Sequence, residues 1–228
     1  MGIESETPVR FTSAAARVYA IVGVLVALGW PFAVKLFVQA NAGRLTSVHD
    51  DVRTMAIEWS VVAVLAAIAF GLQKLRPRVF QLRGLGWLDV LFVFGGLLAA
   101  LVFSAAVSAK VAAPKFDLHQ LALVPIAVRV CLVLTAALCE EFIYRGFAIE
   151  ELGALTGSRW VGAVASLALF FLGHVGVYGF STALLIPASV GLVITLLYMF
   201  RNNLFVCMLV HGCMDGLFLI LIPALLHR

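Results

Sequence analysis

The chain is poor in charge: only 12% of its 228 residues are Asp, Glu, Lys or Arg, while 63% are hydrophobic. A soluble domain has about 25% charged and about 45–50% apolar residues. The shortage of charge therefore excludes an ordinary soluble domain and predicts an integral membrane protein. The net charge of +4 does not indicate nucleic-acid binding, because the basic residues lie between apolar runs, where they set helix orientation.

Cysteine is also scarce, and no CxxC pair or secreted disulfide pattern occurs. We expect the four cysteines to be buried packing residues, as cysteine often is. A cleaved signal peptide is not predicted either, since the first apolar run starts late and is too long for one. The four cysteines are Cys131, Cys139, Cys207 and Cys213.

What the chain does contain is a series of long apolar runs. About 20 apolar residues span the hydrocarbon core as a helix, so seven runs predict an all-α, polytopic bundle of about seven transmembrane helices. When the loops are assigned alternately to the two sides of the membrane, Lys and Arg are denser on the side that holds the N-terminus. This distribution favours a cytoplasmic N-terminus. The runs are Tyr19–Val38, Ala56–Leu72, Leu88–Ser108, Pro125–Leu152, Trp160–Gly173, Ala183–Phe200 and Leu204–Leu226.

Polar side chains interrupt the apolar runs at three places in the C-terminal half. A charge inside a membrane segment costs at least a few kcal/mol, so such groups usually face a partner, a water-filled pocket or a reaction. We therefore expect the function to lie where the three places meet. They are Glu140, Glu141 and Arg145, then His174, and then His211 with Asp215.

Spacing suggests how these groups are arranged. Glu141 and Arg145 are four residues apart, in the favourable order for a helical ion pair. This pair leaves Glu140 without a charged partner, the condition in which a carboxyl group can serve as a general base. His211 and Asp215 are also four apart and share one helix face.

Counting residues places the groups at comparable depth. Glu140 lies fifteen residues before Leu155, the middle of a predicted turn, and His174 lies nineteen after it. At about 1.5 Å per residue, an antiparallel hairpin brings the two within about one turn of each other. His211 follows the next turn by nine residues, and comes out about one turn shallower. The site is expected to close within the membrane from three helices.

Together the three motifs resemble those of the CPBP family, which includes type II CAAX prenyl endopeptidases and bacterial proteins linked to bacteriocin processing and immunity. The resemblance covers residues 125–222 and implies a catalytic helical core there. Residues 1–124 then form the N-terminal transmembrane helices of the same bundle. The motifs are Glu140-Glu141-x-x-x-Arg145, Phe170-x-x-x-His174 and His211-x-x-x-Asp215.

The resemblance implies an intramembrane glutamic endopeptidase. Glu140 would activate a water molecule with His174, and His211 with residue 215 would stabilise the oxyanion. An ionised Asp cannot donate a hydrogen bond, so Asp215 is either protonated or orients His211; we favour the second. The supporting residues implied by the same resemblance are Glu141, Arg145 and Phe170.

Three alternatives remain open. A zinc protease could use Glu140, His174, His211 and Asp215 as a tetrahedral ligand set, but HExxH spacing is missing, so we expect no metal cofactor. A non-catalytic scaffold or bacteriocin-immunity protein would be favoured by loss of motif residues, and none is lost. A proton-coupled transporter would be favoured by inverted repeats, and none is evident.

The expected partners follow from the peptidase hypothesis. They are a membrane-anchored or lipidated peptide substrate and the lipid bilayer itself, with no nucleic acid. The compact chain favours a plasma membrane, or the endoplasmic reticulum if the source is eukaryotic.

Overall fold

A computed structural model describes residues 13–39, 48–74, 80–111, 123–175 and 181–226. Helices account for nearly all of these residues, and no strand occurs among them. The prediction of an all-α bundle is therefore confirmed.

The helices form successive rods that coincide with the predicted apolar runs. Three of the rods change their hydrogen-bonding pattern along their length, from α-helical to the wider π-helical form. In chain order the rods are α1 (Ala14–Gln39); α2 (Val48–Ala66) with η1 (Ala67–Leu72); α3 (Trp87–Ser108); α5 (Ile126–Thr135) with η3 (Ala136–Ile149) and α6 (Glu150–Thr156); α7 (Arg159–Gly173); η4 (Thr182–Leu184) with α9 (Leu185–Arg201); and α10 (Leu204–Gly216) with η5 (Leu217–Leu221) and α11 (Ile222–Leu226).

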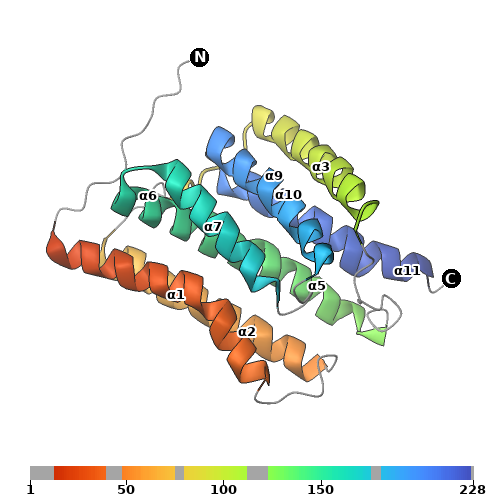
Figure 1. Ribbon diagram of the computed structural model, residues 1–228, viewed down its shortest axis with the longest axis horizontal. Helices are drawn as coiled ribbons and strands as arrows, with labels where there is room; N and C mark the ends of the chain where they lie inside the picture. The colour runs from red at the N-terminus through yellow and green to blue at the C-terminus, as the bar shows by residue number, and fades with distance from the viewer. Residues whose placement is uncertain (1–12, 40–47, 75–79, 112–122, 176–180, 227–228) are drawn as a thin grey trace.

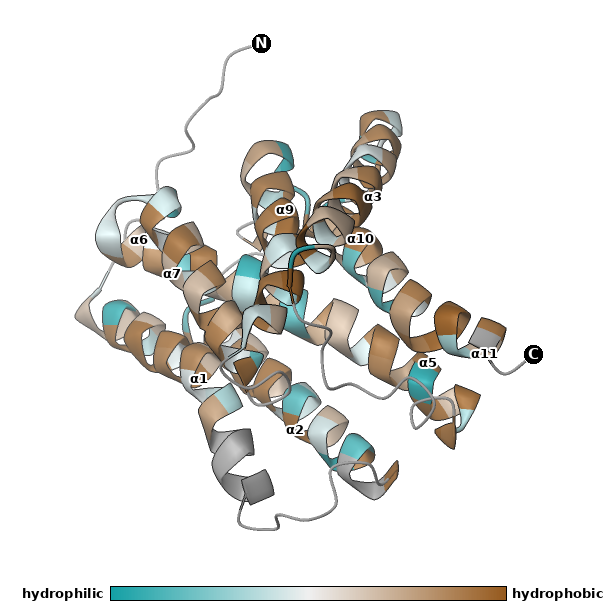
Figure 2. Cartoon of the chain, turned by 45° about the vertical axis from the view of Figure 1, so that its right-hand side comes forward, coloured by the Kyte–Doolittle hydropathy of each residue, from teal (hydrophilic) through white to brown (hydrophobic). Residues whose placement is uncertain are grey.

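Five of the described rods are long and apolar enough to cross a membrane: Ala14–Phe32, Asp51–Leu72, Trp87–Ser108, Thr182–Arg201 and Leu204–Leu225. Hydrophobic residues dominate the rods along their length, as the brown of Figure 2 shows. Many large apolar side chains also point outward, such as Trp87, which is 73% exposed, and Phe94, which is 67% exposed. An outward apolar face suits contact with lipid. These helices therefore indicate that the chain is an integral membrane protein.

The rod that contains η3 lies at the centre of the bundle. It packs against α1, α2, α7 and α10. α3 packs on α9 at the edge remote from α1 and α2, as Figure 1 shows. The predicted acidic pair therefore occurs on the most enclosed rod.

Short capped turns connect the rods that carry the predicted motifs. Gly157 and Asn202 adopt the left-handed conformation at the ends of their helices, with φ of 76° and 52°. The side chains of Ser158 and Asn203 then accept hydrogen bonds from Val161 and Phe205 backbone N–H groups at the start of α7 and α10. Glycine and asparagine tolerate this backbone, and Ser and Asn are preferred N-caps.

Ion pairs tie the helix ends together on the side predicted to be cytoplasmic. Arg201 Nε lies 2.6 Å from Asp89 Oδ1, which joins α9 to α3. Arg159 Nη2 lies 2.7 Å from Glu150 Oε1, and the Tyr198 hydroxyl donates to the same oxygen over 2.7 Å. These contacts hold the ends of α6, α7 and α9 in register below the site.

Candidate active site

The acidic pair occupies the π-helical segment η3, where the backbone is wider than in the flanking α-helix. Such segments are uncommon and often occur at functional sites. Glu141 and Arg145 are fully buried, with 0% and 1% exposure, and Glu140 is half-buried. Three ionisable groups therefore lie inside the apolar bundle, as their spacing predicts.

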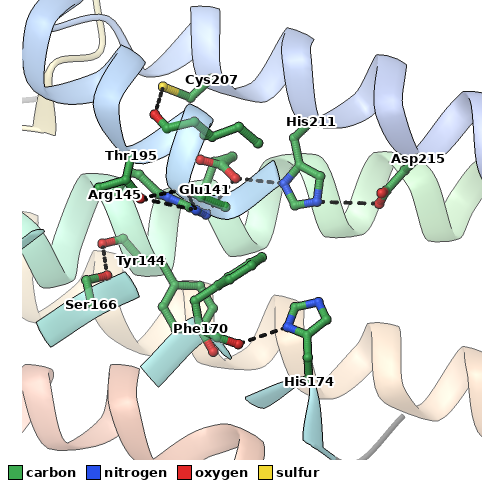
Figure 3. A network of polar contacts seen from close by, with 12 residues as sticks. Glu141, Tyr144, Arg145, Ser166, Phe170, His174, Thr195, Cys207, His211 and Asp215 are labelled. Atoms are coloured by element: carbon green, nitrogen blue, oxygen red, sulfur yellow. Dashed lines mark hydrogen bonds and ion pairs between the residues drawn. The ribbon is translucent and has the colours of Figure 1, made fainter. Parts of the chain in front are cut away.

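Glu141 joins the first and third motifs. Its Oε1 accepts a hydrogen bond from Arg145 Nη1 over 2.8 Å, the predicted pair, and lies 2.7 Å from His211 Nδ1. Because a carboxylate oxygen accepts, His211 Nδ1 carries the proton and donates. Figure 3 shows both contacts. The histidine contact was not predicted, since it joins residues 70 positions apart on different helices.

Arg145 is held from two further helices. Its Nη2 donates to the Gly191 carbonyl over 3.0 Å and approaches Thr195 Oγ1 at 3.5 Å, both on α9. Its guanidinium lies over the Phe170 ring of α7, 4.6 Å from the centroid. Such a cation–π contact adds to the ion pair with Glu141. The guanidinium is therefore fixed in one place and serves as the buried counter-charge of the site.

Phe170 separates the two histidines. It is 3% exposed, and its ring centroid lies 4.5 Å from that of His174 and 6.5 Å from that of His211. Tyr144 packs edge-on against it at 5.3 Å. The structure thus brings the second and third motifs to one aromatic side chain, while the supporting role of Phe170 stays a prediction.

His174 caps the C-terminal end of α7. Its Nδ1 lies 2.9 Å from the Phe170 carbonyl oxygen, to which it donates, as Figure 3 shows. With the proton on Nδ1, the neutral ring presents Nε2 as an acceptor. His174 therefore has the tautomer that a proton acceptor in the site requires.

His211 lies between two carboxyl groups on different helices. Its Nε2 is 3.5 Å from Asp215 Oδ2, longer than its 2.7 Å contact with Glu141. Asp215 is also the more open group, with a side chain 28% exposed against 7% for His211. The sequence favours Asp215 as the partner that orients His211; the structure adds Glu141 as the nearer carboxylate, and the role of Asp215 stays a prediction.

Glu140 precedes Glu141 in η3, and one of its carboxyl oxygens has no partner among the described residues. Its Oε2 is buried and makes no hydrogen bond to the residues that the structure describes. Buried polar atoms are nearly always hydrogen-bonded, so a carboxyl oxygen without a protein donor is suited to hold a water molecule or a substrate group.

Glu58 is a further buried acidic residue, and it lies outside the three motifs. It lies on α2, which packs against η3, and is 7% exposed. The signal was present in the sequence, because Glu58 is an acidic residue within the run Ala56–Leu72. The rule that singled out the C-terminal motifs, that charges in membrane segments are costly, applies equally to it.

The zinc alternative requires several donors to converge on one ion. Within the described ranges, no group of three or more His, Cys, Asp or Glu side chains is arranged to hold a metal ion. The expectation that no metal cofactor is needed stays a prediction, and a chelator tests it.

The fold and site together define a class: an α-helical integral membrane protein with a buried cluster of glutamate, histidine and arginine. A family model described as "Type II CAAX prenyl endopeptidase Rce1-like" matches residues 122–217, which contain all three motifs. That part of the chain is therefore similar to the type II CAAX prenyl endopeptidases, in agreement with the resemblance that its motifs carry. No curated protein and no solved structure matches the chain.

Proposed function

We propose that this protein is an intramembrane endopeptidase of the glutamic type, which cleaves membrane-associated or lipidated peptides. The observation that carries the proposal is that the buried Oε2 of Glu140 makes no hydrogen bond to the described residues, while the adjacent Glu141 contacts His211. The family match supports a CAAX-type protease at the level of the family. In this proposal residues 125–222 form the catalytic core, and helices of residues 1–124 complete the bundle.

In the proposed reaction, Glu140 is the general base. The water oxygen bonds to the scissile carbonyl carbon while one water proton passes to the Glu140 carboxylate. His174, with Nε2 as an acceptor, helps to orient the water. When the C–N bond breaks, the proton held by Glu140 passes to the leaving nitrogen, and the carboxylate is restored.

His211 is suited to stabilise the oxyanion. Its Nδ1 already donates to Glu141, so the imidazolium form is the one that also offers an Nε2–H to substrate. The carboxylates of Glu141 and Asp215 on either side stabilise that positive charge. In an apolar, water-poor site such a preorganised donor is worth more than in water, and losing one typically costs about 10²–10³ in rate.

The substrate in this proposal is a membrane-anchored peptide that enters the bundle from the bilayer. The membrane is a plasma membrane, or the endoplasmic reticulum in a eukaryote.

A cleavage assay on the purified protein tests the proposal. Membrane-anchored reporter tails of varied sequence, with and without a lipid group, are reconstituted in liposomes with wild type or Glu140→Gln. Cleavage by wild type that is lost in Glu140→Gln is expected. A matched control is Glu151→Gln, a buried carboxyl on the same rod (3% exposed), about 16 Å farther along the helix.

Two results would overturn the proposal. The first is equal cleavage by wild type and Glu140→Gln. The second is a cellular phenotype of the gene that survives Glu140→Gln, which would favour a non-catalytic scaffold.

A further inference from the structure

A groove lies between α3 and α9, at the edge of the bundle that Figure 1 shows. Its volume is about 450 Å³, and all nine residues that line it are hydrophobic or glycine. They include Phe92, Gly95 and Ala99 of α3 and Val193 and Phe200 of α9. In a bilayer such a groove holds hydrocarbon, so the question is which molecule supplies it.

Small residues of α3 leave this space open beside a close helix contact. At Gly96 the two helices touch, because an added Cβ would overlap the Leu197 side chain. At the neighbouring Gly95, an added Cβ meets nothing within 4 Å. Ala99, one turn farther along α3, is exposed and lines the same space. The groove therefore runs along a helix contact that is tight on one side only.

α9 separates the groove from the candidate active site. Gly191 and Thr195 contact Arg145 from one face of α9. Val193, which lines the groove, is two residues from each of them, about 200° around the helix axis. A molecule in the groove therefore does not touch the reacting groups, and the groove is a separate site.

One end of the groove carries basic groups. Phe200 at this end precedes Arg201, whose guanidinium carbon lies 5.5 Å from the centroid of the Phe92 ring. The Nε of Arg201 pairs with Asp89, while its two terminal nitrogens donate to no residue that the structure describes. Arg83 donates to the Arg201 carbonyl over 2.7 Å and lies 3.8 Å from the Asp89 carboxylate. Two guanidinium groups thus face one carboxylate, which leaves one positive charge in excess.

The basic end lies at the level of the phospholipid headgroups. It is on the side of the membrane predicted to be cytoplasmic, where basic pockets between helices attract anionic lipids. Trp87, exposed at the start of α3, fits the same level, because tryptophan favours the membrane–water interface. Val193 is eight residues from Arg201, so the groove extends about 12 Å from this level into the hydrocarbon.

We propose that this groove, together with Arg201, binds an anionic phospholipid from the leaflet on the side of the N-terminus. One acyl chain lies in the groove, and the phosphate accepts hydrogen bonds from the terminal nitrogens of Arg201. Any acyl chain of the bilayer fits an apolar groove, so the headgroup decides which lipid is preferred. A lipid with net negative charge is favoured over a zwitterionic one, because the basic end has a positive charge in excess.

Native mass spectrometry of the full chain in detergent micelles tests the proposal. The probes are phosphatidylglycerol and phosphatidylcholine with the same acyl chains. Wild type is expected to retain one phosphatidylglycerol about fivefold better than phosphatidylcholine, the scale of one basic group acting on an anionic headgroup. Thermal unfolding first shows that each variant below is folded.

Gly95→Leu tests the groove, because the new side chain fills it without a clash at Cβ. This variant is expected to lose the preferred phosphatidylglycerol. The matched control is Ala106→Leu, which adds bulk at an exposed position of α3 that does not line the groove. It is expected to bind both lipids as wild type does.

Arg201→Gln tests the headgroup contact. It is expected to retain the two lipids equally, because the groove is unchanged while the phosphate loses its donor. If Arg201→Gln does not fold, since Asp89 loses its partner, the comparison of Gly95→Leu with Ala106→Leu still decides.

Three results would each overturn the proposal. Equal retention of the two lipids by wild type would show that the headgroup is not recognised. An unchanged preference in Gly95→Leu would place the lipid elsewhere. A wild-type dimer that Gly95→Leu converts to a monomer would make the groove an interface between copies of the chain. None of these measurements needs cleavage, so the proposed peptidase function is tested independently.

Discussion

Glu141 Oε1 lies 2.7 Å from His211 Nδ1 and 2.8 Å from Arg145 Nη1, so one buried oxygen joins two helices of the site. The adjacent Glu140 has no such bonds from the described residues to its Oε2. Two neighbouring glutamates therefore differ in kind: one organises the site, and the other is available for chemistry.

The first prediction separates these two glutamates. Glu141→Ala leaves the Arg145 guanidinium buried without its partner, and breaking a buried ion pair in this way typically costs about 3–5 kcal/mol. We expect a large drop in thermal stability together with loss of cleavage. Glu140→Gln is expected to lose cleavage while unfolding within a few degrees of wild type. Equal stability losses in the two variants would contradict this division.

The second prediction concerns Asp215. Because Glu141 is the nearer carboxylate to His211, we expect Asp215→Asn to keep cleavage within about tenfold, whereas His211→Ala loses about 10²–10³-fold, as for removal of an oxyanion donor. The kcat values of the two variants are compared in the liposome assay. A loss in Asp215→Asn as large as in His211→Ala would instead make Asp215 the residue that orients the ring.

The third prediction concerns His174. Its Nδ1 donates to the Phe170 carbonyl of its own helix, and replacing the ring removes a proton acceptor from the site. His174→Ala is expected to lower kcat about 10²–10⁴-fold, the scale of general acid–base catalysis, with thermal stability near that of wild type. The matched control is His211→Ala, which should affect stability more because it also strips a partner from Glu141. Wild-type activity in His174→Ala would remove this residue from the mechanism.

The fourth prediction concerns the close approach of α9 to the site. A Cβ added at Gly191 would lie 2.7 Å from Phe170 Cε1 and 3.4 Å from Arg145 Nη2. Gly191→Ala must therefore displace the ring or the guanidinium, and we expect a loss of about 1–3 kcal/mol together with reduced cleavage. Gly95→Ala is the control, because nothing lies within 4 Å of its added Cβ. Similar stability in both variants would show that the helices separate at little cost.

The fifth prediction concerns metal. Cleavage is expected to be unchanged by a zinc chelator, because the proposed base acts on water without a Lewis acid. A known zinc protease in the same liposomes provides the positive control for chelation. Loss of cleavage that added Zn²⁺ restores would revive the metal hypothesis.

Much of the architecture follows from local sequence. Apolar runs must become helices in a bilayer, since a helix satisfies its own backbone hydrogen bonds there. Turn residues such as Gly157 and Asn202 mark where one helix ends, shortly before the next begins. The i, i+4 spacing likewise placed Arg145 against Glu141, because neighbours on a helix are determined by its period.

The sequence by itself determined the helices, their ends and the identity of the motif residues, because these depend on nearest neighbours and on the cost of charge in an apolar run. Only the tertiary structure decided which groups meet across helices. The contact of Glu141 with His211 depends on how α10 rotates and slides against η3. That packing is set by side chains along whole helix faces, which no short motif encodes.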